Sequence, residues 1–182
     1  MARSNTIQSG TPVRFLIIGY GDKLRGDDAV GLRVAEIVAS WHLPSVQSLA
    51  VPQLTPELVN DIAASDYVIF VDACSRSSGS STLQLDPIVI GGCSSRTLAV
   101  KEKETRCYDP LSLLELTQQL HNRAPQAWFL KVPIESLEVG EELSSTTERG
   151  CDRAVRTIEQ FISHYGPPVR IEQTQSNSIG NI

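Results

Sequence analysis

Three aspartates stand where the chain changes from apolar to polar sequence. Asp27 and Asp28 lie within "GYGDKLRGDDAVG" (19–31), directly after the apolar run "VRFLIIG", and Asp72 closes the run "YVIFVD". Two carboxylates that converge on one crevice either raise the pKa of one of them or share a cation. Carboxylate oxygens with room for a nitrogen or sulfur ligand suit a transition metal. The residue types therefore favour a metal-contacting pair formed by Asp28 and Asp72.

The same aspartates have a simpler interpretation. Asp27 would cap the following helix, Asp28 would favour the positive end of its dipole, and Asp72 would bond to backbone N–H groups in a turn. Nucleotide binding is disfavoured, because the G-x-G-x-x-G fingerprint has Leu24 in place of its third glycine and no G-K-[ST] triplet occurs. The remaining choice is between a structural and a metal-contacting role.

The elements that would position these aspartates alternate along the chain. Strands are predicted at 13–19, 46–51, 67–73, 82–90 and 127–133, and helices at 28–40, from Thr55, at 111–120 after the cap Asp109, and from a capping box of Ser145 and Glu148 to about His164. Pro87 places the fourth strand at an edge or a bulge. This alternation predicts an α/β fold, a mostly parallel twisted sheet with helices on both faces.

The order of the strands decides whether the aspartates meet. With the common order 2-1-3-4-5, the first and third strands are neighbours, and ligands bind beyond the carboxyl ends of the strands where the order reverses. Asp28 and Asp72 would then converge at one edge of the sheet, beside the loop of Gly19 and Gly21.

Composition limits the class of protein. The 182 residues are 41% hydrophobic and carry a net charge of -5, which disfavours nucleic acid as a partner. We expect one domain over 12–166 with flexible tails at 1–11 and 167–182. Since the sequence shows neither an apolar leader nor a run of roughly 18 apolar residues, we expect a cytoplasmic protein without a membrane partner. The four cysteines form no CxxC pair, so free thiols are expected.

Four segments together resemble one family. They are "LIIGYGDKLRGDDAVG", "LTPEL" at 54–58, "VIFVDA" at 68–73 and "VPIESLEVGEELSSTTERG" at 132–150. In these segments the chain is similar to the hydrogenase maturation endopeptidases, which remove the carboxyl-terminal extension from the large subunit of nickel-iron hydrogenases. The likeness is strongest to the branch that serves bidirectional hydrogenases.

The resemblance implies a five-stranded sheet between helices and a site that contacts nickel already loaded in the substrate. Asp28 and Asp72 match two acidic residues of that site, and Gly19 and Gly21 match a loop that would let backbone approach the substrate. The implied partner is the large-subunit precursor, the implied cofactor is nickel supplied by that precursor, and a monomer is expected. The resemblance assigns no attacking group, so the catalytic residue is unknown.

The chain departs from the family pattern at two positions. Asp22 replaces an asparagine, and the family histidine, expected a few residues before Pro110, is missing from "KETRCYDPLSLLEL". Arg106 or Cys107 occupies its position. Arginine has no free lone pair for a metal, whereas a Cys107 thiolate is able to ligate nickel or could be an idle thiol. The alternative function is therefore a relative that binds hydrogenase precursor without cleaving it.

Overall fold

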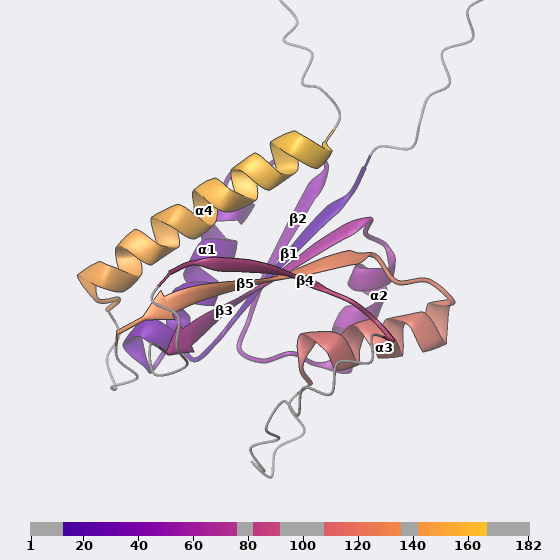
Figure 1. The fold of residues 1–182 in the computed structure, drawn as a ribbon, viewed down its shortest axis with the longest axis horizontal. Helices are drawn as coiled ribbons and strands as arrows, with labels where there is room; N and C mark the ends of the chain where they lie inside the picture. The colour runs from indigo at the N-terminus through magenta and orange to yellow at the C-terminus, as the bar shows by residue number, and fades with distance from the viewer. Residues whose placement is uncertain (1–12, 76–81, 92–107, 136–141, 167–182) are drawn as a thin grey trace, which may run out of the picture.

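The computed structural model describes residues 13–75, 82–91, 108–135 and 142–166. The strands are β1 (Phe15–Tyr20), β2 (Val46–Val51), β3 (Tyr67–Ser75), β4 (Gln84–Ile88) and β5 (Gln126–Ile134). The helices are α1 (Val30–Ala39), α2 (Val59–Ala63), α3 (Pro110–His121) and α4 (Ser145–Tyr165), with the 3-10 turns η1 (Gly26–Ala29) and η2 (Pro56–Leu58) before α1 and α2. The predicted α/β class is confirmed (Figure 1). The predicted tails and Cys107 lie outside the described residues.

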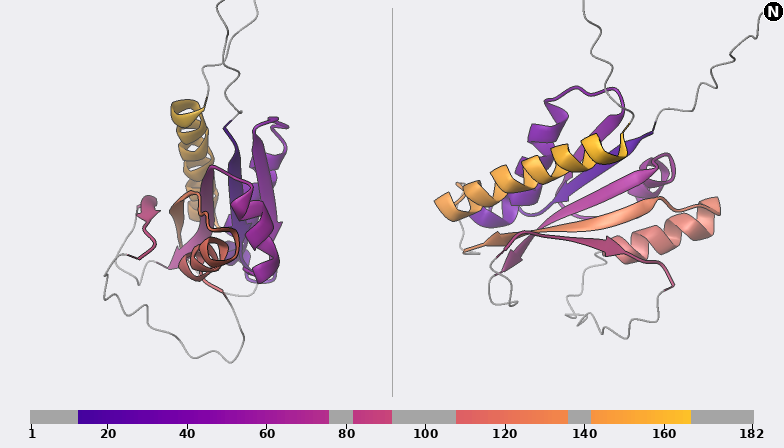
Figure 2. Two further views of the ribbon diagram at one scale, coloured as in Figure 1. Left: turned by 90° about the vertical axis from the view of Figure 1, so that its right-hand side faces the viewer. Right: turned by 45° about the horizontal axis from the view of Figure 1, so that its top comes forward.

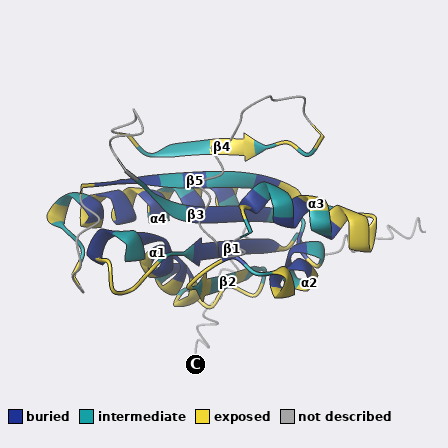
Figure 3. Ribbon diagram, turned by 90° about the horizontal axis from the view of Figure 1, so that it is seen from below, coloured by how far each residue is buried: buried dark blue, intermediate teal, exposed yellow. Residues whose placement is uncertain are grey.

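The five strands form one sheet in the order β2-β1-β3-β5-β4. The predicted order is therefore wrong at one edge, because β5 lies beside β3 and β4 is the outer strand, antiparallel to β5. Leu130 and Val132 of β5 are fully buried, whereas Asp86 and Pro87 of β4 are exposed. Since proline donates no ladder hydrogen bond, β4 belongs at an edge, as predicted for Pro87. Figure 3 shows the contrast in burial between β4 and the central strands.

Helices cover both faces of the sheet, and successive strand residues supply the two cores (Figure 2). On one face α1 and α4 bury Val34, Val38, Ala154 and Ile158 against Ile17, Ile69, Val71 and Leu130. On the other face α2 and α3 bury Ile62, Leu113 and Leu114 against Leu16, Ile18, Val68 and Phe70. Side chains of a strand alternate between the two faces of the sheet, so strand residues two apart lie on the same face.

Two helices begin at side-chain caps. Asp109 accepts from the backbone N–H of Ser112 (2.9 Å) and caps α3, as predicted. For α4 the cap is Ser144, whose hydroxyl accepts from Thr147 N–H at 3.3 Å, so the predicted capping box of Ser145 and Glu148 is wrong by one residue. In the described ranges, no helix combines the length and apolarity required to cross a bilayer.

Candidate functional site

Asp72 lies near the carboxyl end of β3, on the face covered by α2 and α3. Its neighbour on β1 is Tyr20, because Gly19 and Val71 are paired in the parallel register. Tyr20 follows Ile18 by two residues and Asp72 follows Phe70 by two, so both side chains continue the apolar rows on this face. The sheet therefore places a phenol and a carboxyl group side by side at its edge.

Asp72 is half-buried, and its surroundings change its acidity. Burial raises the pKa of Asp72 to about 7, the Tyr20 hydroxyl and the Ala73 N–H lower it, and the negative charge of Asp28 raises it. The Ala73 N–H donates to Asp72 Oδ1 at 2.8 Å. No lysine or arginine of the described residues is among these influences. Lys131, which is paired with Asp72 in the β3–β5 register, donates instead to Asp86 at 2.9 Å.

Tyr20 was not anticipated from the sequence, although its position at the end of β1 was a usable signal. Burial raises the pKa of the Tyr20 phenol above its ordinary value, as do the charge of Asp72, the hydrogen bond to it and the charge of Asp109. The phenol therefore stays protonated and acts as a hydrogen-bond donor to Asp72. Asp109, the cap of α3, is brought to this edge as well.

Asp28 reaches the same edge from η1, which packs against β3. Its Oδ2 accepts from the backbone N–H of Asp22 at 3.1 Å, and its side chain is half-buried. The structure thus brings Asp28 close enough to Asp72 for its charge to act on that carboxyl group. Two carboxylates far apart in the chain share one edge of the sheet, and their contact with a metal stays a prediction.

Asp27 does not have the role that the simpler interpretation assigned to it. It is 4% exposed and does not cap a helix, because no side chain caps η1 or α1. Its carboxylate accepts from the backbone N–H of Ser144 (2.6 Å), the hydroxyl of Ser144 (2.9 Å) and the backbone N–H of Glu135 (3.2 Å). Asp27 therefore joins η1 to the end of β5 and to the cap of α4, which an isolated sequence pattern did not indicate.

The glycines around this edge allow backbone segments to touch one another. A Cβ on Gly19 would lie 1.8 Å from the carbonyl oxygen of Gly31, and a Cβ on Gly31 would lie 2.4 Å from that of Tyr20, so α1 packs directly on β1 and β3. Gly21 has a φ of +151°, and its Cβ would lie 2.0 Å from the carbonyl oxygen of Asp28. Gly19 and Gly21 thus have an internal reason to be glycine, and their contact with a substrate stays a prediction.

The soft ligands of the described chain lie mostly elsewhere. His42, His121 and His164 are all exposed and follow or end helices, as expected for residues outside the site. Cys151 is buried in α4, where burial raises the pKa of its thiol to about 11. Cys74 follows Asp72 by two residues and is half-buried. Among the residues that the structure describes, no group of three or more His, Cys, Asp or Glu side chains is arranged to hold a metal ion.

Comparison with known proteins gives a consistent result for the fold. No protein-family model matches the chain, and no curated protein is significantly similar to it in sequence. Solved structures match its fold, and several of them are hydrogenase maturation endopeptidases.

Three of these structures show how far the likeness extends. HybD of Escherichia coli is 22% identical, with 84% of this chain and 93% of that chain covered and a TM-score of 0.64. HycI of Thermococcus kodakarensis is 24% identical, with 85% and 95% covered and a TM-score of 0.63. HybD of the same archaeon is 20% identical, with 82% and 99% covered and a TM-score of 0.62. This chain therefore has the fold of those proteases over most of their length.

Proposed function

We propose that this chain is an endopeptidase that removes the carboxyl-terminal extension of a nickel-loaded nickel-iron hydrogenase large-subunit precursor. The observation on which the proposal depends is the pair Asp28 and Asp72 at the carboxyl edge of a sheet with the hydrogenase maturation protease fold. Asp72 is half-buried without a described cationic partner, which is an unfavourable state for a carboxylate unless a cation binds beside it. It stays a prediction that the precursor belongs to a bidirectional hydrogenase, that the protein is cytoplasmic and that it is a monomer.

The ion in this proposal arrives with the precursor and is part of the substrate. Two carboxylates offer two hard oxygen donors, which are too few to hold a nickel ion by themselves. An ion that keeps its ligands from the precursor needs only two further ligands from this protein. A bound nickel ion supplies Lewis acidity, which polarises a carbonyl or activates a water. The protein residues then have distinct tasks: Asp28 and Asp72 contact the ion, Tyr20 holds the Asp72 carboxyl group, and Asp27 fixes the turn that carries Asp28.

The dependence on nickel would act as a check on the substrate. Without the ion, the two carboxylates repel each other, and the precursor gains no contact with them. With the ion, the same carboxylates favour the loaded precursor over the empty one. The proposal therefore predicts cleavage of loaded precursor only.

Mass spectrometry of intact precursor tests this function. Purified protein is incubated with nickel-loaded and with nickel-free large subunit, and the loss of the extension is measured as a drop in mass. We expect shortening of the loaded precursor alone by the wild-type protein and none by Asp28→Ala or Asp72→Asn. Asp152→Asn, a change of an exposed aspartate on α4, is the matched control and should process normally. Normal processing by both site variants would contradict the assignment.

A second function is favoured by one observation, the lack of a third described ligand beside Asp28 and Asp72. The chain would then bind precursor without cleaving it. A native gel separates the two functions, because a binder shifts the precursor without changing its mass. Asp28→Ala and Asp72→Asn are tested in the same gel. Loss of precursor binding by Asp72→Asn would mean that the precursor contacts the carboxyl edge of the sheet.

A further inference from the structure

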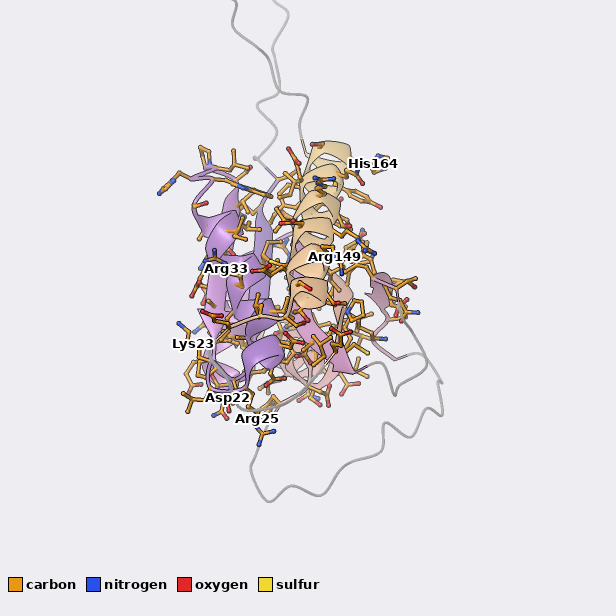
Figure 4. The ribbon with its side chains drawn as sticks, turned by 90° about the vertical axis from the view of Figure 1, so that its left-hand side faces the viewer. Asp22, Lys23, Arg25, Arg33, Arg149 and His164 are labelled. Atoms are coloured by element: carbon orange, nitrogen blue, oxygen red, sulfur yellow. The ribbon has the colours of Figure 1, made fainter. Side chains whose placement is uncertain are left out.

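A hollow lies between the loop before η1, α1 and the start of α4. Its volume is about 740 Å³, and its apolar lining comes from Leu24, Ala29, Leu32 and Leu143. Figure 4 views this side of the molecule, with Lys23 and Arg33 on the loop and helix at one side and Arg149 on α4. Ala29, which directly follows Asp28 in η1, is part of this lining.

A second hollow continues the first around the loop. It has a volume of about 590 Å³, shares Lys23 and Leu32 with the first, and is bordered by Gly21 and Asp22. The backbone N–H of Asp22 is the group that donates to Asp28 Oδ2. The two hollows therefore form one groove that passes along the loop on which Asp28 is fixed.

The loop is built to expose one apolar side chain. Asp22 Oδ1 accepts from the Leu24 N–H at 2.9 Å, and the Asp22 carbonyl accepts from the Arg25 N–H at 3.1 Å, which holds the loop in a tight turn. Leu24 is 66% exposed at the rim of the groove, whereas Leu32 on its floor is 3% exposed. Leu24 thus stands above an apolar floor, and an apolar side chain placed between the two would bury apolar surface on both.

The charges around the groove are unequal at its two ends. Glu36 already pairs with Lys23 (3.4 Å) and with Arg33 (4.0 Å), so no described carboxylate of this end is left without a cation. Glu142 and Glu148, at the α4 end, form no ion pair within the described part of the chain. A partner with a positive charge at that end would be complementary, and an acidic partner would be repelled.

We propose that this groove binds an extended segment of the precursor that presents an apolar side chain to Leu24 and Leu32 and a lysine or arginine to Glu142 and Glu148. The inference rests on the proposed function, since it makes the groove the binding site for the polypeptide next to the nickel. The groove holds the chain of the substrate, and Asp28 and Asp72 contact its ion. Recognition of the precursor then has two parts, a peptide contact in the groove and a metal contact at Asp28 and Asp72. Variants of the groove and variants of the two aspartates test these parts separately.

Two leucines with almost equal exposure provide a matched pair of variants. Leu24→Ser changes the groove, and Leu120→Ser changes a 65% exposed leucine near the end of α3, far from the carboxyl edge. Neither side chain is buried, so both variants should keep the wild-type melting temperature. We expect Leu24→Ser to raise the KM for nickel-loaded precursor about tenfold with kcat within about twofold, and Leu120→Ser to change neither. Equal kinetics of the two variants would overturn the proposal.

Peptide binding tests the groove without any cleavage. Fluorescein-labelled Gly/Ser-rich dodecapeptides with a central Leu-Lys, Leu-Glu or Ser-Lys pair are titrated with the full chain, and anisotropy is measured. The Leu-Lys peptide should bind at least about fivefold more tightly than the other two, and Leu24→Ser should remove that preference. Glu142→Gln should weaken the Leu-Lys peptide about threefold at low salt and less at high salt. If neither Leu24→Ser nor Glu142→Gln changes the affinity for the Leu-Lys peptide, the proposal is overturned.

The two tests distinguish this inference from the proposed function. If the Leu-Lys peptide binds as expected but wild-type protein cleaves no precursor, the groove is a peptide site and the endopeptidase assignment fails. If precursor is cleaved but Leu24→Ser behaves as the wild type, the endopeptidase stands and the groove is not its peptide site. A concentration-dependent dimer that Leu24→Ser dissociates would identify a second copy as the occupant and also overturn the proposal.

Discussion

One aspartate directly precedes the central strand β3 and another lies near its carboxyl end, and their surroundings shift their pKa values in opposite directions. Asp66 precedes the strand and accepts from the Arg14 N–H (2.9 Å) and the Arg123 guanidinium. Burial raises the pKa of Asp66, but the hydrogen bonds and charges of Arg14 and Arg123 outweigh it and lower the pKa overall. Asp72, near the other end, has a phenol and a second carboxylate as neighbours, and its pKa is raised to about 7.

The amino edge of the sheet therefore stabilises the fold, whereas its carboxyl edge is available for chemistry. At the amino edge, Asp66 connects β1, the α3–β5 connection and β3 through paired charges and backbone bonds. At the carboxyl edge, the ionised form of Asp72 is disfavoured in the folded chain. A carboxylate that costs stability in the isolated protein is typical of a binding or catalytic position.

The largest effect is expected for Asp72→Asn. Because the folded pKa of Asp72 is about 7 against an ordinary value of 3.8, its ionisation costs stability as the pH rises between these values. The variant removes that cost, so its free energy of unfolding at pH 8 should exceed that of the wild type by on the order of 2–4 kcal/mol, with no gain at pH 4. Urea unfolding of the metal-free protein at both pH values measures this, and the variant should not process precursor. A loss of stability at pH 8 would show that the Asp72 carboxylate is stabilising.

Asp27→Ala tests the structural aspartate of the same edge. It removes the acceptor of three partly buried hydrogen bonds, from the Ser144 N–H and hydroxyl and from the Glu135 N–H, so the free energy of unfolding should fall by about 2–4 kcal/mol at pH 7. Thermal unfolding followed by circular dichroism measures the change. Its neighbour Asp28 is the control, because Asp28→Ala removes one bond to Asp22 and should cost less than about 1 kcal/mol while abolishing processing. Equal losses in the two variants would remove the distinction between them.

Arg123→Gln weakens the amino edge. The Asp66 side chain is 34% exposed, so solvent screens the pair and the expected loss is about 1 kcal/mol at pH 7. A carboxyl group with a lowered pKa contributes stability above its ordinary value of 3.8, and this contribution disappears as the pH falls through its folded pKa. Wild type and variant should therefore become alike at pH 2–3 and differ above pH 4. A difference that is constant with pH would assign the effect to packing of the arginine stem.

The smallest effect concerns the coupling within the carboxyl edge. Since the charge of Asp28 raises the pKa of Asp72, Asp28→Asn should lower the pH at which Asp72 ionises in the metal-free protein, by less than about one unit. Carbon-13 NMR of the Asp72 carboxyl group measures this value. Asp152→Asn is the control, because Asp152 is exposed on α4 and is not among the groups that shift the pKa of Asp72. An unchanged titration of Asp72 in Asp28→Asn would mean that the two carboxylates do not sense each other.

Local pattern was sufficient to find most elements of the fold. Continuous apolar runs identified β1 and β3, because strands buried on both faces leave little room for polar residues. The shorter runs of β2 and β5 were also recognised, although β2 is an edge strand and only half-buried. Pro87 identified the edge strand by its missing N–H, and Asp109 identified the start of α3. The order of β4 and β5 was not predictable in this way, since it depends on which strand packs best beside β3.

The candidate site was predictable in part, as a pair of aspartates after two strands. The sequence by itself determined that Asp28 and Asp72 follow apolar strands, because residue order and periodicity are local properties of the chain. Only the tertiary structure decided that Tyr20 donates to Asp72, that Asp27 joins η1 to α4, and that a groove passes beside Asp28. These contacts join residues from separate elements, and their geometry depends on the sheet register and helix packing, which act over the whole fold.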